Sequence, residues 1–195
     1  IPPLSELPID NAPISVPVPI AATDVGALSI GSSDNGGITL NGAIVTDGEI
    51  VIDGPVTLAT GAVSVTTTDD ALTFNHTIDG AQALTLVSGT AATAIQGEIG
   101  GSTAISSLTI TNGTAVGTIE ISNIGGVTGA TSIGNTNTAT LTLDGTAYTT
   151  TGAQTYTAAA GQNIDITGAN ATFTTTNANI GFATAGVDLA NNGTT

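Results

Sequence analysis

Residues 50–86 read IVIDGPVTLATGAVSVTTTDDALTFNHTIDGAQALTL. Short segments of this stretch have apolar residues at alternate positions, at 50–52, 63–65, 72–74 and 84–86. Successive side chains of a β-strand point to opposite faces, so this alternation predicts strands with one face in a core. The dipeptides Asp53-Gly54 and Asp79-Gly80 are typical of turns. The stretch therefore predicts short strands joined by tight turns.

The same pattern continues on both sides, at residues 27–30, 38–40, 108–110, 119–121, 141–143, 164–166 and 171–173. Two further turn dipeptides, Asn112-Gly113 and Asp144-Gly145, lie between these segments. Thr, Val and Ile dominate between the glycines, and β-branched residues favour a pleated surface. The chain has no Lys, Arg or Met, which are good helix formers. We therefore expect an all-β fold.

Two series of residues recur at nearly constant spacing. The first steps by 22–24 residues through Leu28, Ile50, Leu72, Ile95, Ile119, Leu141 and Ile164. The second steps by 22–25 residues through Leu40, Val63, Leu86, Leu108, Ile133 and Tyr156. A shared period is typical of a solenoid, in which one coil of chain is repeated. We expect a parallel β-helix (β-solenoid) of about 7–8 coils over residues 23–195, with strands about 4.8 Å apart.

The composition excludes several classes of function. The 195 residues contain 15 carboxylates, one histidine and no basic side chain, for a formal charge of −15. Such a chain cannot neutralise phosphates, so we expect no nucleic-acid binding and no docking on anionic membranes. No apolar stretch approaches the length of about 18 residues of a membrane helix. The absence of cysteine removes disulfides, thiolate metal sites and thiol catalysis.

Residues 1–22, IPPLSELPIDNAPISVPVPIAA, hold six of the seven prolines. We expect an extended Pro-rich arm or edge strand here, separate from the solenoid. In an extended strand one face would carry the apolar residues Ile14, Val16, Val18 and Ile20. The alternate positions, which face the other side, include Pro13, Pro17 and Pro19. Proline is confined to edge strands, so this segment fits an arm that adds a strand to another copy of the chain. A semi-rigid polyproline-like linker is the alternative.

Three segments of the sequence resemble those of a known family: TIDGAQALTL at residues 77–86, GGSTAISSLTI at residues 100–110 and TTTGAQTY at residues 149–156. They look like the repeats of filamentous-haemagglutinin-type adhesins and autotransporter passengers of bacteria, over residues 70–175. The resemblance implies a right-handed parallel β-helix, secretion to the cell surface and an adhesive or fibrous role. The chain departs from that family in carrying no basic residue.

Catalytic candidates are few, and we expect no enzyme. His76 is the only histidine and shares the parity of Phe74 and Ile78, so it either faces the core or lies at a corner with its polar atoms satisfied. A polysaccharide-processing enzyme would need two carboxyl groups about 5–10 Å apart across a sugar. The close pairs are Asp69-Asp70 and Asp47-x-Glu49, but the chain offers few aromatic platforms and no cation.

Calcium is the cofactor to consider, since Asp and Glu at turns supply hard oxygen ligands. The expected weak site comprises Asp47, Glu49, Asp69 and Asp70. Diffuse screening of the charge by counterions, with no bound cofactor, is the leading expectation, and this calcium site is the alternative to it. N-glycosylation sequons begin at Asn75, Asn112, Asn170 and Asn192.

The function expected from the sequence is structural. The chain has no Lys or Arg, so trypsin finds no cleavage site in it, and no Cys or Met, so it has no sulfur that oxidants could attack. Both properties suit a protein that lies outside the cell. We expect a secreted or cell-surface protein that forms a subunit or stalk of a bacterial or archaeal surface fibre through strand pairing with other copies. One alternative is an adhesin stalk that binds host or surface glycans, and a second is the enzyme described above.

Overall fold

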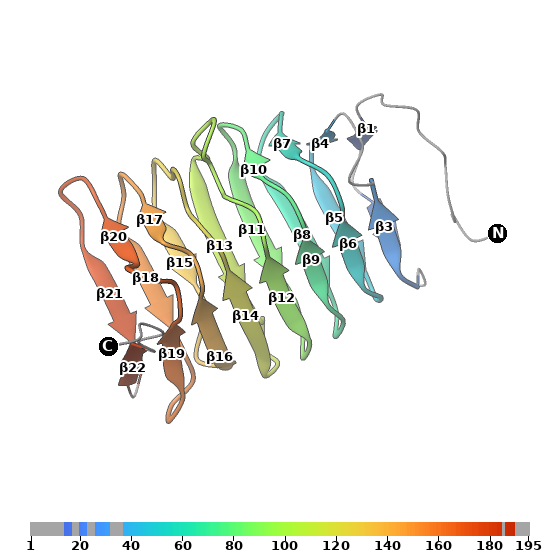
Figure 1. Ribbon diagram of the computed structural model, residues 1–195. Coiled ribbons are helices and arrows are strands. Elements are labelled where there is room, and N and C mark those ends of the chain that lie inside the picture. The colour runs from blue at the N-terminus through green and yellow to red at the C-terminus, as the bar shows by residue number, and fades with distance from the viewer. Residues whose placement is uncertain (1–13, 17–19, 23–25, 32–36, 185, 190–195) are drawn as a thin grey trace.

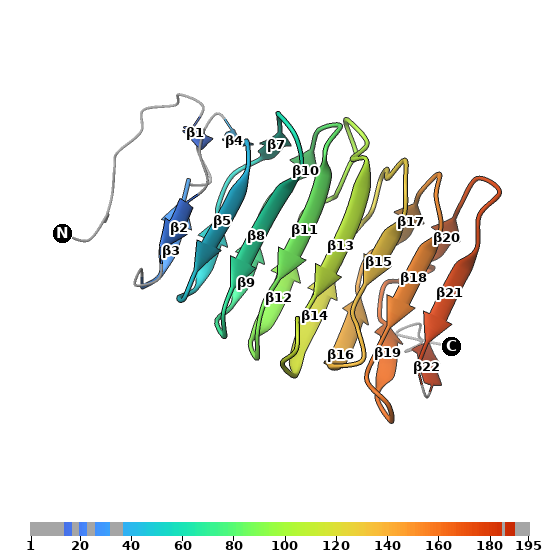
Figure 2. The same cartoon turned by 180° about the vertical axis from the view of Figure 1, so that it is seen from behind.

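The computed structural model describes residues 14–16, 20–22, 26–31, 37–184 and 186–189. In these ranges the chain forms a parallel β-solenoid of about seven turns, seen from its two sides in Figures 1 and 2. The all-β parallel β-helix expected from the sequence is confirmed. No described element is a helix of the length and hydropathy needed to cross a membrane.

Each coil contributes to three sheets, which run along the rod. Sheet A contains β1 (Ile14–Val16), β4 (Ile38–Leu40), β7 (Val56–Leu58) and β10 (Ile78–Asp79), continues through bridges at Ile99 and Ile124, and ends with β17 (Ala147–Thr149) and β20 (Thr172–Thr174). Sheet B contains β2 (Ile20–Ala22), β5 (Ala43–Thr46), β8 (Val63–Thr67), β11 (Ala83–Val87), β13 (Ser107–Thr111), β15 (Thr131–Ile133), β18 (Gln154–Thr157) and β21 (Ile180–Ala183). Sheet C contains β3 (Leu28–Ile30), β6 (Ile50–Ile52), β9 (Leu72–Phe74), β12 (Ala92–Ile95), β14 (Gly117–Ile121), β16 (Thr138–Leu143), β19 (Asn163–Ile166) and β22 (Gly186–Leu189).

The alternating residues of these strands build one core along the axis of the rod. In β14, for example, Ile119 and Ile121 are buried while Thr118 and Glu120 are exposed. Inward side chains from successive coils stack because the strands pair in parallel register, as Ile50 does with Leu72. No single coil can bury its own inner face, so stability comes from contact between neighbouring coils.

The coil length varies more than the expected constant period. Paired residues are 18 positions apart between Ile38 and Val56, and 26 apart between Gln154 and Ile180. The first expected series follows the observed register from Leu28 to Leu72 and from Ile119 to Ile164, and it is wrong only at Ile95. Leu72 pairs with Thr93, so the buried Thr93 takes the ladder position expected for Ile95.

The second expected series mixes residues that belong to different ladders of stacked side chains. Leu40 lies in sheet A, where it pairs with Leu58. Val63 pairs with Leu84 rather than Leu86. Only its final step, from Ile133 to Tyr156, follows the observed register.

Pairing also occurs on the N-terminal side of Ala22. Strand β1 pairs with β4 and β2 pairs with β5 of the same chain, so both belong to the first coil. Strand β1 lies in sheet A and β2 in sheet B, so the two are separate strands of different sheets.

A column of polar side chains lies inside the corner between sheets B and C. Thr93 Oγ1 donates a hydrogen bond to Ser88 Oγ (2.8 Å), and Asn112 Nδ2 donates to the same oxygen (3.1 Å). Thr138 Oγ1 in turn donates to Asn112 Oδ1 (2.9 Å). These four residues are buried, and their mutual hydrogen bonds offset the loss of water.

Candidate functional site

The C-terminal end of the rod carries the candidate site. Strands β20, β21 and β22 are each the last of their sheet among the described residues (Figure 1). The inner surface of this end is aromatic, since four of the chain's five aromatic residues lie in the last two coils. These four residues, which we call the aromatic cluster, are Tyr148, Tyr156, Phe173 and Phe182.

The aromatic cluster consists of two stacks. Tyr148 and Phe173 stack with ring centroids 4.7 Å apart and planes 10° apart. Tyr156 and Phe182 stack at 5.2 Å and 16°. The two stacks meet edge to face, for instance between Phe173 and Phe182 at 5.4 Å and 82°. Offset stacks and edge-to-face contacts are the favourable geometries for such rings, so the cluster holds the last two coils together.

Exposure increases at the final coil. Tyr148 and Tyr156 are fully buried, whereas Phe173 and Phe182 are only partly buried. Ile180, which pairs with the buried Gln154, is 37% exposed. An apolar layer that is covered in the middle of the rod therefore reaches the surface here.

The two tyrosine hydroxyls have partners in the core. Tyr148 Oη accepts a hydrogen bond from the backbone N–H of Gly145 (2.8 Å), and Tyr156 Oη donates to Gln154 Oε1 (2.9 Å). Gln154 Nε2 donates to the carbonyls of Tyr148 (2.8 Å) and Thr174 (2.9 Å), which ties the last coils together. Burial raises the pKa of both tyrosines above the ordinary value, so both stay neutral at physiological pH.

The aromatic cluster was not among the sites expected above, although the sequence carries a signal for it. Tyr148 and Phe173 are 25 positions apart, and Tyr156 and Phe182 are 26 apart, both close to one coil. Large side chains that recur at the coil period near one end of a solenoid predict a stack at that end.

The residues expected to form the assembly arm are only partly described. Ile14 and Val16 lie in β1 and Ile20 lies in β2, while Val18 falls outside the described residues.

The four expected calcium ligands gather at one corner. Asp47 and Glu49 follow β5, and Asp69 and Asp70 follow β8, the next strand of sheet B. Thr68 Oγ1 donates to Asp47 Oδ1 (3.0 Å), which links the two loops. All four carboxylates are exposed, and no group of three His, Cys, Asp or Glu residues arranged to hold a metal occurs in the described part of the chain. Calcium binding at this corner stays a prediction.

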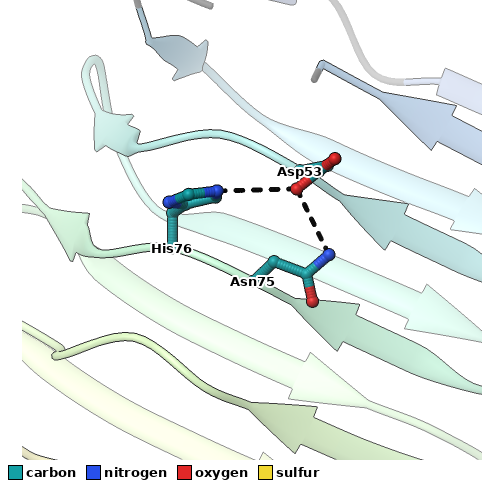
Figure 3. A network of polar contacts seen from close by, with 3 residues as sticks. All are labelled: Asp53, Asn75 and His76. Carbon is teal, nitrogen blue, oxygen red and sulfur yellow. Dashed lines mark hydrogen bonds and ion pairs between the residues drawn. The ribbon is translucent and has the colours of Figure 1, made fainter. Parts of the chain in front are cut away.

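His76 lies at a corner between sheets C and A rather than in the core. Its Nε2 is 3.5 Å from Asp53 Oδ1, which also accepts a hydrogen bond from Asn75 Nδ2 at 3.3 Å (Figure 3). The His76 and Asp53 side chains are 35% and 33% exposed. The parity with Phe74 fails because the strand ends at Phe74 and the chain turns.

The sequons differ in access. Asn170 is exposed, in a turn with φ of 57°, and Asn75 is half-buried. Asn112 is buried, and both ends of its amide are bonded inside the corner, so the folded chain offers no space for a glycan there. Asn192 lies outside the described residues.

Comparison of the chain with protein-family models, with curated proteins and with solved structures found no match.

Proposed function

We propose that this chain is a structural subunit of an extracellular fibre, and that copies join end to end by stacking the last coil of one copy on the first coil of the next. The observation that supports this most directly is the apolar layer at the C-terminal end, formed by Phe173, Ile180 and Phe182. Burial of partly exposed apolar surface provides the driving force for such a contact.

The two ends of the rod match in geometry. Strands β20, β21 and β22 contain 3, 4 and 4 residues, and β1, β2 and β3 contain 3 residues each. Because all strands are parallel, β1 to β3 of a second copy would continue sheets A, B and C in the same direction. A strand at the edge of a sheet is a template for such pairing. A head-to-tail contact that does not close into a ring gives an open filament.

This end stacking replaces the exchange of an N-terminal arm as the proposed mechanism, since β1 and β2 pair within their own chain. The adhesin-like segments and the absence of Lys, Arg, Cys and Met agree with a structural role at a cell surface rather than an enzymatic one.

Electron microscopy of the purified protein tests the proposal. Sheets of eight strands about 4.8 Å apart give an axial repeat of about 38 Å per subunit. The variant Ile180→Asp would place a carboxylate at every junction, and filaments should be lost while the circular dichroism spectrum is retained. The matched control is Val116→Asp, because Val116 is 62% exposed in the loop between β13 and β14, away from both ends.

The outcomes separate the alternatives. Filaments from the wild type and Val116→Asp, but not from Ile180→Asp, would support end stacking. Equal filaments from all three proteins would contradict the junction. Isolated rods from the wild type would contradict self-assembly and favour the stalk of an adhesin, to be followed by a screen for glycan binding.

A further inference from the structure

The outer surface of sheet B differs from the rest of the rod in its charge. Among the described residues, no carboxylate lies on a strand of this sheet. The outer side of sheet C, in contrast, carries Glu120 and Asp165, and sheet A carries Asp79. In a chain with a net charge of −15, this uncharged surface, which we call face B, is where two copies meet with the least repulsion.

Small side chains cover face B in regular columns. One column runs in register through Ala43, Ser64, Thr85, Thr109, Ser132, Thr155 and Gly181. A second runs through Val45, Thr66, Val87 and Thr111. These residues point outward because their neighbours in the strands, such as Leu108 and Ile110 beside Thr109, are buried. Val45 is one of the exposed large hydrophobic residues, at 41%.

We infer that face B is a lateral docking surface for face B of a second copy. Two such rods approach each other without bringing carboxylates together on this surface, whereas contact through sheet C would oppose like charges. Columns of methyl and hydroxyl groups with the strand spacing are also suited to close packing between two sheets. The inference rests on the proposed filament, because face B becomes continuous when subunits stack end to end.

The size of face B fits this role. Eight strands about 4.8 Å apart span about 34 Å, and the strands of three to five residues, at about 3.3 Å each, span about 10–16 Å. Face B therefore covers roughly 450 Å² per copy, or about 900 Å² for a pair, which is just below the lower limit for a specific interface. A single pair is weak, but the contact repeats along a filament and the repeated contacts act together. We expect bundles of filaments, not stable dimers of single subunits.

One pair of substitutions tests face B. Thr109→Asp adds a charge at the middle of the first column, between Thr85 and Ser132. Thr73→Asp adds the same charge to the outer side of sheet C, between Val51 and Ala94. Both threonines are half-buried strand residues, so the two variants are matched in charge, position type and cost to the strand.

Bundling is measured by electron microscopy and sedimentation of protein purified free of polysaccharide. Wild type and Thr73→Asp should form bundles, whereas Thr109→Asp should form single filaments, with the bundled fraction lowered by more than about tenfold. Single filaments from the wild type, or equal bundling of all three proteins, would overturn the role of face B and leave end stacking intact. A wild type that forms no filaments would overturn both proposals.

Discussion

Replacing Asn112 by aspartate is expected to destabilise the rod, whereas the same replacement at Asn123 is expected to be tolerated. Asn112 is fully buried, and its Nδ2 and Oδ1 are bonded to Ser88 and Thr138. The aspartate would lose the donated hydrogen bond and place a negative charge in the core with no basic side chain in the whole sequence to compensate it. An uncompensated buried charge costs about 3–5 kcal/mol. For a chain of this size that loss lowers Tm by about 6–20 °C.

We expect the opposite result at Asn123, because its side-chain oxygen is the atom that makes the hydrogen bonds. Asn123 Oδ1 accepts hydrogen bonds from the backbone N–H groups of Thr146 (2.7 Å) and Ala147 (3.0 Å). A carboxylate accepts such bonds more strongly than an amide does, although Asp144 at the same corner offsets part of the gain. Asp79 already has this arrangement, accepting from the N–H groups of Ser102 (2.8 Å) and Thr103 (2.9 Å). We expect Asn123→Asp to change the stability by less than about 1 kcal/mol.

Thermal unfolding followed by circular dichroism between pH 8 and pH 5, above the isoelectric point of about 4.1, checks both variants. Burial raises the pKa of the carboxyl group at position 112 above its unfolded value. The folded variant therefore binds more protons than the unfolded one, and its deficit should shrink as the pH falls. Equal losses at the two positions, or a deficit at position 112 that does not change with pH, would show that a buried charge is not the cause of the destabilisation.

Three further outcomes follow from the structure. A Cβ at Gly89 would overlap the carbonyl oxygen of Thr68 in the preceding coil, so Gly89→Ala should lower the free energy of unfolding by about 1–3 kcal/mol. The control Gly26→Ala, whose Cβ would have no atom within 4 Å, should leave it unchanged, and chemical denaturation measures both. Because burial raises the pKa of Tyr148 and Tyr156, their contribution to the free energy of unfolding is complete below about pH 10 and is lost at higher pH. Tm should therefore fall above about pH 10, and it should fall less in the double Tyr→Phe variant. His76→Gln should change the free energy of unfolding by less than about 1 kcal/mol, because His76 and Asp53 are each about one-third exposed; a larger loss would show that this contact supports the corner.

The alternating pattern predicts many of the strands and their core-facing side chains, although it misses β5 and β7. Alternation is a local property, so Leu-Thr-Phe at residues 72–74 and Leu-Thr-Leu at residues 84–86 reveal their inward residues without knowledge of any partner. The turn dipeptides Asp53-Gly54 and Asp144-Gly145 lie between strands as expected, and the average period near 22–23 residues was enough to predict a solenoid.

The register and the candidate site depend on how the coils stack. The number of residues in each corner varies, and a strand can slip by two residues without exposing its apolar face, so Thr93 rather than Ile95 follows Leu72. The burial of Asn112, the exposure of His76 and the lack of charge on face B likewise depend on which corner or sheet each residue reaches. Alternation sets the direction of a side chain within its own strand, but only the stacking of complete coils sets which side chains become its neighbours.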